Sequence, residues 1–177
     1  MKVHLRLWEK KDNKALAGLA NNIHIWNNVR DRLPYPYEIQ HADAFIQFCT
    51  EQSSPTVMAI EAGGELAGCI GVELQTDISR ISAELGYWIG EPYWGRNIAT
   101  MAVAQMTDYT FAYFPGIIRI FARVFEYNVA SMRVLEKNGF HREAIHKHSV
   151  IKNHRVWDDH LWVKFREPLP SFKESNG

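Results

Sequence analysis

Hydrophobic and polar residues alternate along the chain with two periods, and together these periods predict a mixed α/β fold. Val3, Leu5 and Leu7 occupy every second position, which is the period of a strand with one buried face. Two helical patterns follow, and the first begins at Asp12, a residue type that commonly caps helices. In chain order the expected strands are 3–8, 56–62, 66–74, 81–89, 118–125, 140–150 and 155–165, and the expected helices are 12–20, 42–49, 98–113 and 128–139.

The longest expected helix has a clear apolar face and ends at Pro115-Gly116. Its apolar residues recur at helical spacing: Ile98, Ala102, Met106, Tyr109 and Tyr113. The elements follow one another without an internal repeat or a linker. We therefore expect one domain over residues 1–166, followed by a frayed tail at 167–177.

Charge and cysteine content argue against several classes of protein. Lys and Arg together number 20, as do Asp and Glu, so no net field attracts nucleic acid. No apolar run reaches the roughly 20 residues that span a bilayer, and the N-terminal residues lack the apolar stretch of a signal peptide. Cys49 and Cys69 are expected to be free thiols, because two cysteines make no disulfide framework. We expect a cytoplasmic protein without nucleic-acid or membrane partners.

The segment from Glu84 to Thr100 carries the first chemical signal. A strand-like run leads through a Pro/Gly turn into small residues that open the helix at 98–113. The first N–H groups of a helix have no partner within it and lie at the positive end of its dipole, so they can bind a phosphate. The loop matches neither the P-loop nor the dinucleotide fingerprint, because Gly95 is its only glycine.

Residues Trp94–Ala99 (Trp-Gly-Arg-Asn-Ile-Ala) resemble the acyl-CoA loop of the GNAT superfamily of N-acetyltransferases, written [Q/R]-x-x-G-x-[G/A]. Trp in the first place looks like the branch that acetylates ribosomal-protein N-termini. Asn97 replaces a glycine of the pattern, and Asn is the non-glycine residue that best tolerates a left-handed backbone. The run Asn128–Phe140 resembles the second signature of the family, N-x-x-[A/S]-x-x-[L/V]-[Y/L]-E-K-x-G-F, and it follows in the expected order.

The resemblance implies the GNAT acyltransferase fold, a mostly antiparallel mixed sheet with flanking helices and one splayed parallel pair of strands. Acetyl-CoA would bind as co-substrate between the strands at 81–89 and 118–125. Its pantetheine arm would pair with backbone groups of the first strand, and its pyrophosphate would rest on the N–H groups of the loop. Arg96 would add a charged contact or lie on the surface as an ordinary arginine. The implied cofactor-binding residues are Tyr87, Trp88, Ile89, Trp94, Gly95, Arg96, Asn97, Ile98, Ala99, Thr100 and Asn128.

The resemblance also implies where catalytic groups would lie. Many family members carry a proton-donating Tyr at the position of Leu135, so this chain lacks that acid. Ser131 matches a serine of the ribosomal-protein branch, and it is either the proton donor or an ordinary helix-start residue. Glu84 lies one residue away from the position of a catalytic glutamate in the histone-acetylating branch, and such an offset turns a strand side chain to the other face. It is either the general base or an ion-pair partner, and water is the alternative base.

Histidines and aromatic residues allow further interpretations. No metal site is expected, because four histidines match no structural zinc spacing: His146, His148, His154 and His160. The run Trp157–His160 resembles a final-strand motif of the same branch, with a role in acceptor recognition or in folding. Four aromatic residues either wall the acceptor site or pack in the core: Trp26, Tyr35, Tyr37 and Trp94.

The sequence thus predicts an enzyme that transfers acetyl from acetyl-CoA to a primary amine. A protein N-terminus, a polyamine and an amino sugar are the candidate acceptors, and the resemblance favours the first. A non-catalytic acyl-CoA-binding module is the main alternative, and a nucleotide-binding protein is a weaker one. Assembly as a homodimer is left open.

Overall fold

The structure is a computed structural model that describes residues 1–168, so most of the predicted tail lies outside the described residues. Its strands are β1 (Val3–Arg6), β2 (Val57–Ala62), β3 (Glu65–Leu74), β4 (Ser82–Ile89), β5 (Arg119–Phe125), β6 (His141–Lys152) and β7 (Arg155–Phe165). Its helices are α1 (Asn13–Ala20), α2 (Ile23–Trp26), α3 (Ile39–Glu51), α4 (Ile98–Tyr113) and α5 (Val129–Lys137), with short 3-10 turns η1 (Lys10–Asp12), η2 (Asp77–Ser79) and η3 (Glu91–Tyr93). None of these helices is long and apolar enough to cross a membrane.

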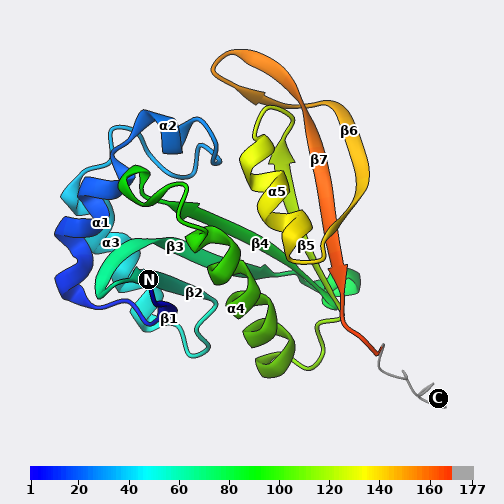
Figure 1. Cartoon of the computed structure of the whole chain (residues 1–177), viewed down its shortest axis with the longest axis horizontal. Coiled ribbons are helices and arrows are strands. Elements are labelled where there is room, and N and C mark those ends of the chain that lie inside the picture. Colours follow the sequence, from blue (N-terminus) through cyan, green and yellow to red (C-terminus); the bar gives the residue numbers. More distant parts are fainter. Residues whose placement is uncertain (169–177) are drawn as a thin grey trace.

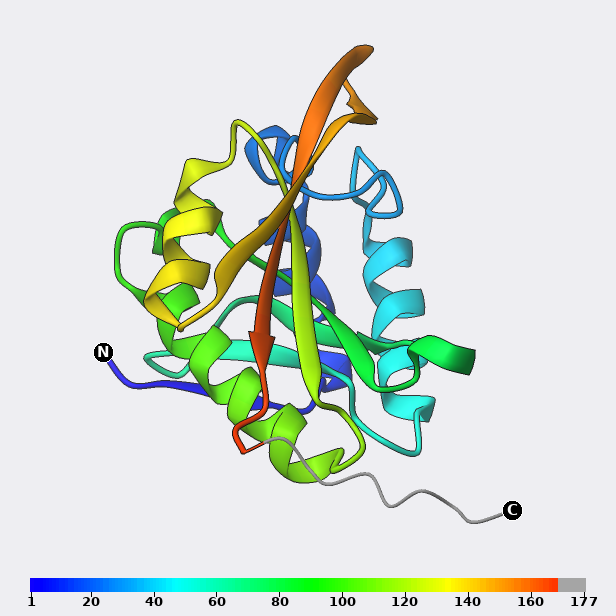
Figure 2. The same ribbon diagram turned by 90° about the vertical axis from the view of Figure 1, so that its right-hand side faces the viewer.

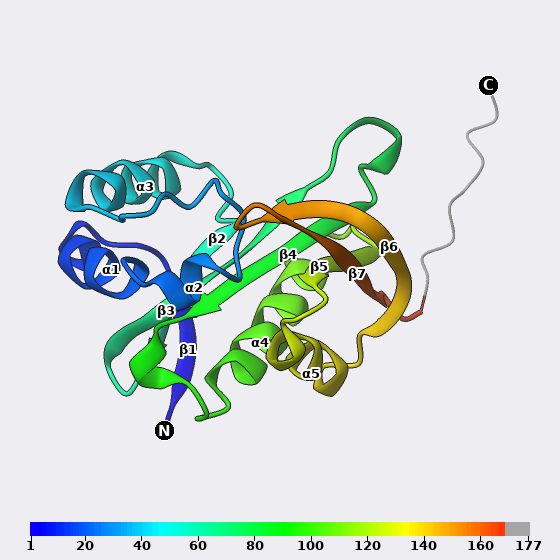
Figure 3. The same ribbon diagram turned by 90° about the horizontal axis from the view of Figure 1, so that it is seen from above.

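The seven strands form one sheet in the order β1-β2-β3-β4-β5-β7-β6, in which only β4 and β5 run parallel. Helices α1 and α3 lie on one face of the sheet, and α4 and α5 lie on the other (Figure 3). Two apolar clusters fill these layers, a larger one under α4 and α5 and a smaller one under α1 and α3. The predicted mixed α/β fold, a mostly antiparallel sheet with flanking helices, is confirmed.

Two local predictions were wrong. Asp12 precedes α1, but its carboxylate does not cap that helix. It accepts hydrogen bonds from both terminal nitrogens of Arg6, at 2.7 and 2.8 Å, and from the N–H of Glu9 at 2.9 Å. A charged, two-pronged donor binds a carboxylate more strongly than a helix N–H does. Arg6 supplies this donor from the end of β1, outside the predicted helix.

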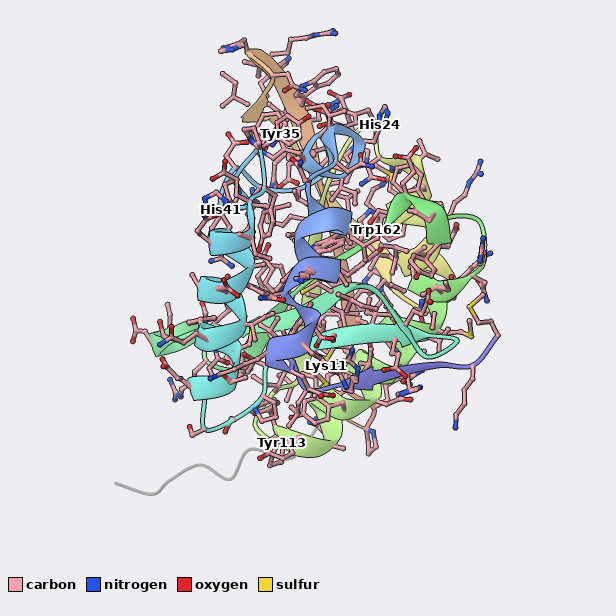
Figure 4. All side chains as sticks on the ribbon, turned by 90° about the vertical axis from the view of Figure 1, so that its left-hand side faces the viewer. Lys11, His24, Tyr35, His41, Tyr113 and Trp162 are labelled. Carbon is pink, nitrogen blue, oxygen red and sulfur yellow. The ribbon has the colours of Figure 1, made fainter. Side chains whose placement is uncertain are left out.

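The predicted apolar face of α4 ends one turn early. Ile98, Ala102 and Met106 are fully or almost fully buried, whereas Tyr113 is 52% exposed at the outer end of the helix (Figure 4). Its ring stacks on Tyr109 with centroids 5.2 Å apart, so it covers a neighbour instead of entering the core.

The strands β4 and β5 pair only over their first three residues, Ser82–Glu84 with Arg119–Phe121. Beyond this point they diverge, while β4 stays paired with β3 and β5 stays paired with β7 along their whole lengths (Figures 1 and 2). The resulting splay in the middle of the sheet is the feature that the resemblance predicted. The N-terminal turns of α4 and α5 flank it on the same face.

Candidate active site

The backbone of β4 presents hydrogen-bonding groups to the splay. Ser82 O accepts from Gln75 N at 3.0 Å, and Gly90 N donates to Ala67 O at 2.8 Å, so the even-numbered residues of β4 point their backbone groups toward β3. Backbone groups alternate in direction along an antiparallel strand. The N–H and C=O groups of Leu85, Tyr87 and Ile89 therefore point toward β5, where the two strands no longer pair.

Trp88, which was predicted to contribute backbone groups as well, lies differently. Its backbone is opposite Cys69 of β3, and its side chain packs against the apolar cluster under α1 and α3. The C=O of Ile89 accepts a hydrogen bond from the indole Nε1 of Trp94 at 2.7 Å. The groups left open to a ligand at this edge are thus the N–H and C=O of Tyr87 and the N–H of Ile89.

The loop before α4 presents a row of N–H groups. Within residues 1–168 no acceptor is hydrogen-bonded to the N–H of any residue from Gly95 to Thr100, and the first bonded donor is Met101, whose N–H reaches Asn97 O at 3.2 Å. Gly95 has φ +73° and Asn97 has φ +60°, so both adopt the left-handed backbone, as the sequence predicted for Asn97. A Cβ added to Gly95 would meet no atom within 4 Å, so the backbone here is open to close approach.

Arg96 lies exposed in the same loop, and the described residues include no carboxylate that pairs with it. Its guanidinium is therefore available to an anion bound on the loop. The side chains of Ile98 and Ala99 do not compete for that space: Ile98 is buried, and Ala99 packs against the larger cluster. The N-terminus of α4 thus combines unpaired main-chain donors, a nearby cation and small side chains, which together suit a phosphate group.

Asn128 and Ser131 begin α5 on the opposite side of the splay. The Oδ1 of Asn128 accepts from the N–H of Ser131 at 3.1 Å, so Asn128 is the predicted N-cap. The Nδ2 of Asn128 has no partner among residues 1–168, so it remains available to donate to a ligand. Leu135 is fully buried in the larger cluster, so α5 offers no proton-donating side chain to the splay at that position.

The hydroxyl of Tyr87 reaches across to Ser131. The two side-chain oxygens are 2.8 Å apart, and the phenol also lies within 3.3 Å of the Ser131 carbonyl. Burial raises the pKa of Tyr87 to about 12, although its contact with Ser131 acts in the opposite direction. The family resemblance predicted a role only for the backbone of Tyr87. Strand alternation could have placed its side chain on the α5 face, but no local pattern indicates its partner.

The other face of the splay carries paired charges. Glu84 forms an ion pair with Arg30, in the segment after α2, so the ion-pair alternative for Glu84 is the one that the structure contains. Asp159 of β7 is 1% exposed, accepts a hydrogen bond from Arg123 Nε at 2.5 Å, and has His146 Nδ1 at 3.8 Å. Glu84 and Asp159 are thus each neutralised by an arginine.

The α2 segment is fastened to the β6–β7 hairpin. Tyr127 donates its hydroxyl proton to Asn27 O at 2.6 Å, and Asn153 Nδ2 donates to Asn27 Oδ1 at 2.9 Å. Lys152 is 2% exposed, with its Nζ 2.5 Å from Asp31 and 3.4 Å from the centre of the Trp26 ring.

Figure 4 shows His24 and Tyr35 at this same end of the molecule. An open pocket of about 310 Å³ lies here, lined by Asn27, Asn28, Tyr127, Asn153 and Trp157.

The remaining aromatic and acidic candidates divide between these surroundings and the core. Tyr37 is buried in the smaller cluster, whereas Trp26 packs against Lys152. Asp158 accepts from Lys147 Nζ at 2.6 Å and from His148 N at 2.9 Å, contacts that lower its pKa and fix the hairpin. The described residues contain no group of three or more His, Cys, Asp or Glu side chains that could hold a metal ion.

Comparison with known proteins places this geometry in a family. The acetyltransferase (GNAT) domain family matches residues 2–141. A probable N-acetyltransferase of Bacillus subtilis, YjcK, is 43% identical over 87 residues, and the match spans 49% of this chain and only 47% of that protein.

Two solved structures are similar over nearly the whole chain. RimJ of Mycobacterium smegmatis, solved in complex with a CoA disulfide, has a TM-score of 0.82 and 25% identity over 96% of this chain and 84% of that one. RimL, a ribosomal L7/L12 α-N-protein acetyltransferase solved with coenzyme A, has a TM-score of 0.80 and 20% identity over 93% of this chain and 94% of that one. With a family match over residues 2–141 and a splayed sheet that fits it, the chain belongs to the GNAT acetyltransferase family.

Proposed function

We propose that the protein transfers an acetyl group from acetyl-CoA to a primary amine. The observation that carries this proposal is the alignment of two sets of open backbone groups: those of Tyr87 and Ile89 on β4, and the N–H groups from Gly95 to Thr100 before α4. A ligand with an extended amide arm and a diphosphate suits both at once, and coenzyme A has this composition. Membership of the GNAT family supports the same reading.

The residues would share the ligand as follows. The loop N–H groups and Arg96 would hold the diphosphate, because a helix N-terminus and a guanidinium both favour negative charge. Tyr87, Ile89 and the side-chain amide of Asn128 would hydrogen-bond the amide groups of the arm, in the manner of an added strand. The thioester would then lie between β4 and the first turn of α5, where Ser131 is located.

The transfer itself needs a neutral amine, a polarised carbonyl and a proton for the leaving sulfur. The amine nitrogen attacks the thioester carbon, and a β4 N–H stabilises the negative charge that develops on the oxygen. When the carbon–sulfur bond breaks, the Ser131 hydroxyl gives its proton to the sulfur, and the proton that the amine nitrogen loses restores the donor through solvent. The amine loses one proton and the sulfur gains one, so the overall reaction is balanced.

We infer that the acceptor is a peptide or protein N-terminus. An α-amino group titrates at about 8, so a useful fraction is neutral near pH 7 without a strong base, whereas a lysine amine titrates at about 10.4. This suits a site where Arg30 already occupies the carboxylate of Glu84. The pairing of Glu84 and Asp159 with arginines also gives a polycationic acceptor little unpaired negative charge. The resemblance of Trp94–Ala99 to the branch that acetylates ribosomal-protein N-termini supports the same acceptor.

A non-catalytic acyl-CoA-binding domain is the second candidate, because Leu135 stands where the family pattern has an acid and Glu84 is engaged in an ion pair. Thiol release from acetyl-CoA separates the two candidates. The assay would use peptides that begin with Ser or Ala, together with spermidine and glucosamine, and would identify products by mass spectrometry. Turnover with the peptides alone supports the full proposal. CoA binding without turnover on any of the amines supports the binding domain.

The cofactor site has its own test. Gly95→Val should weaken acetyl-CoA binding at least about tenfold, because a branched side chain cannot easily adopt φ +73° and would cover the loop N–H groups. Gly116→Val is the matched control, since Gly116 also has open space around its Cβ position but lies at the far end of α4. Equal affinities for the two variants in titration calorimetry would contradict the loop assignment.

We also infer that residues 1–166 act as one domain in the cytoplasm. The support is that β5 and β7 pair to Phe165 in the same sheet as β1, and that Cys49 and Cys69 are both free. Limited proteolysis that releases a stable fragment smaller than this range would contradict the single domain. Sedimentation of the purified protein would decide whether it forms the homodimer that the sequence left open.

A further inference from the structure

The phenol of Tyr87 is the one hydroxyl that links β4 to the first turn of α5 across the splay, within the part of the chain that the structure describes. We propose that Tyr87 is a positioning residue: it holds the Ser131 hydroxyl toward the sulfur of coenzyme A and resupplies the proton that Ser131 gives away. The inference rests on the proposed acetyl transfer. It assigns a chemical task to a side chain for which the sequence indicated only a backbone role.

The geometry fixes Ser131 from two sides. Its N–H donates to Asn128 Oδ1 at 3.1 Å, and its Oγ lies 2.8 Å from the hydroxyl oxygen of Tyr87. Tyr87 itself is held by β3 through the strand and by the larger cluster, against which its ring packs. A serine side chain has three staggered rotamers, and a partner at hydrogen-bonding distance selects the one that faces the splay.

The chemistry explains why a phenol is a better partner here than an aliphatic hydroxyl. When Ser131 protonates the departing sulfur, the serine oxygen would become an alkoxide, which is a very unfavourable anion. Transfer of the Tyr87 proton to that oxygen moves the charge to a phenolate instead. Burial raises the pKa of Tyr87 to about 12, so the phenol stays protonated at neutral pH and keeps its proton available.

The proton balance closes without any other reactant. The carbon–sulfur bond breaks, a sulfur–hydrogen bond forms with the Ser131 proton, and the serine O–H forms again with the Tyr87 proton. The proton that the acceptor amine loses restores the phenol through solvent. Tyr109 is a partly buried tyrosine with a purely structural contact: its hydroxyl donates to the Pro55 carbonyl at 2.9 Å, and it takes no part in these proton transfers.

A binding experiment tests the inference without an acceptor. Tyr87→Phe, Ser131→Ala and the double variant would each be titrated with CoA and with desulfo-CoA, which lacks the sulfur. If Tyr87 and Ser131 together contact the sulfur, each single variant should weaken the affinity for CoA about threefold and leave the affinity for desulfo-CoA unchanged. The double variant should then lose no more affinity for CoA than either single variant. Tyr109→Phe is the matched control, since it also removes one phenol oxygen from a partly buried tyrosine, and it should leave both affinities unchanged.

Two outcomes would overturn the inference: equal losses for CoA and desulfo-CoA, which would indicate a packing role, or losses that add in the double variant. Turnover provides the second measurement. Tyr87→Phe should lower kcat about tenfold with little change in the KM for acetyl-CoA, and should have no further effect in the Ser131→Ala protein. If the wild-type protein turns over none of the amines, the proposed function fails, but the CoA titrations still decide the role of Tyr87.

Discussion

The sheet differs on the two sides of the splay. Strands β1 to β4 lie between two layers, with α1 and α3 on one face and α4 on the other (Figure 3). Strands β5, β7 and β6 carry α5 on one face (Figure 3), and the short α2 contacts the β6–β7 hairpin through Trp26 and Lys152. The first side buries mainly apolar residues such as Ile60 and Ile70, with Asp12 as its buried carboxylate, whereas the second buries the charges of Lys152 and Asp159.

This difference separates two tasks. Apolar burial depends little on pH or salt, so the first side holds the open edge of β4 and the loop before α4 in a fixed geometry. The second side holds its shape through ion pairs that face the α2 segment, and charges of this kind select partners more than they stabilise folds. We infer that the first side, together with the first turn of α5, recognises coenzyme A and that the rest of the second side recognises the acceptor.

The largest expected effect is a loss of stability when the first side, β1 to β4 with helices on both faces, is disturbed; we call it the packed side. A Cβ at Gly68 of β3 would lie 2.3 Å from the carbonyl oxygen of Trp88, and backbone cannot yield as a flexible side chain does. Gly68→Ala should therefore lower the free energy of unfolding by about 3 kcal/mol in urea denaturation. Gly86→Ala is the control on the neighbouring strand, where a Cβ meets no atom within 4 Å, and it should change stability by no more than about 0.5 kcal/mol. Similar losses of unfolding free energy in both variants would contradict tight packing around Gly68.

The next effect concerns Asp12, the buried carboxylate of the packed side. Burial opposes its ionisation, but the hydrogen bonds from Arg6 and from Glu9 N outweigh it and lower the pKa. Asp12→Asn should cost about 2 kcal/mol, because Arg6 loses its two-pronged acceptor.

The stability lost in Asp12→Asn should depend on pH in a direction set by the lowered pKa of Asp12. A lowered pKa means that the carboxylate stabilises the fold fully above its unfolded pKa of about 3.9 and loses this contribution as the pH falls through the lower folded value. The difference between wild type and Asp12→Asn should thus be constant near neutral pH and shrink in acid. A difference that grows in acid would refute the assignment.

Replacement of Lys152 should cost less stability than replacement of Asp12, although both residues are buried. Its partner Asp31 is 69% exposed, so the carboxylate remains hydrated when the ammonium is removed. Lys152→Met keeps an apolar chain on the Trp26 ring and should change stability by less than about 1 kcal/mol. Met is also the fair comparison for volume, and Lys152→Ala would add the loss of packing. A loss from Lys152→Met as large as that from Asp12→Asn would show that this ion pair stabilises the fold.

The smallest expected effect is at Glu84. Its partner Arg30 is 54% exposed, so the pair contributes little to stability, and Glu84→Gln should change it by no more than about 0.5 kcal/mol. Because the carboxylate is already paired, we also expect the pH–rate profile to keep its shape. A pH-dependent limb that disappears in Glu84→Gln would instead identify Glu84 as the general base.

Much of the fold was predictable because its signals are local. The period of the apolar residues predicted every strand and four of the five helices. The exception, α2, is one turn long and is capped by Asn22, whose Oδ1 accepts from His24 N at 2.8 Å. A helix of four residues has too short a pattern to be recognised by its period.

The candidate site was predictable only where the backbone decides it. The left-handed Asn97 and the N-cap Asn128 follow from what these side chains do to their own neighbours. The side-chain contacts do not follow, because they join residues 44 positions apart for Tyr87 and Ser131, and 54 apart for Arg30 and Glu84. No local rule contains such a distance.

The sequence by itself therefore determined the order of elements, the family and the loop that can hold a diphosphate. Only the tertiary structure decided which polar groups meet: Tyr87 with Ser131, Glu84 with Arg30, and Lys152 with Trp26. The physical reason is that periodicity and capping act over one or two turns of the chain, whereas partners in a folded protein are chosen by the packing of whole layers.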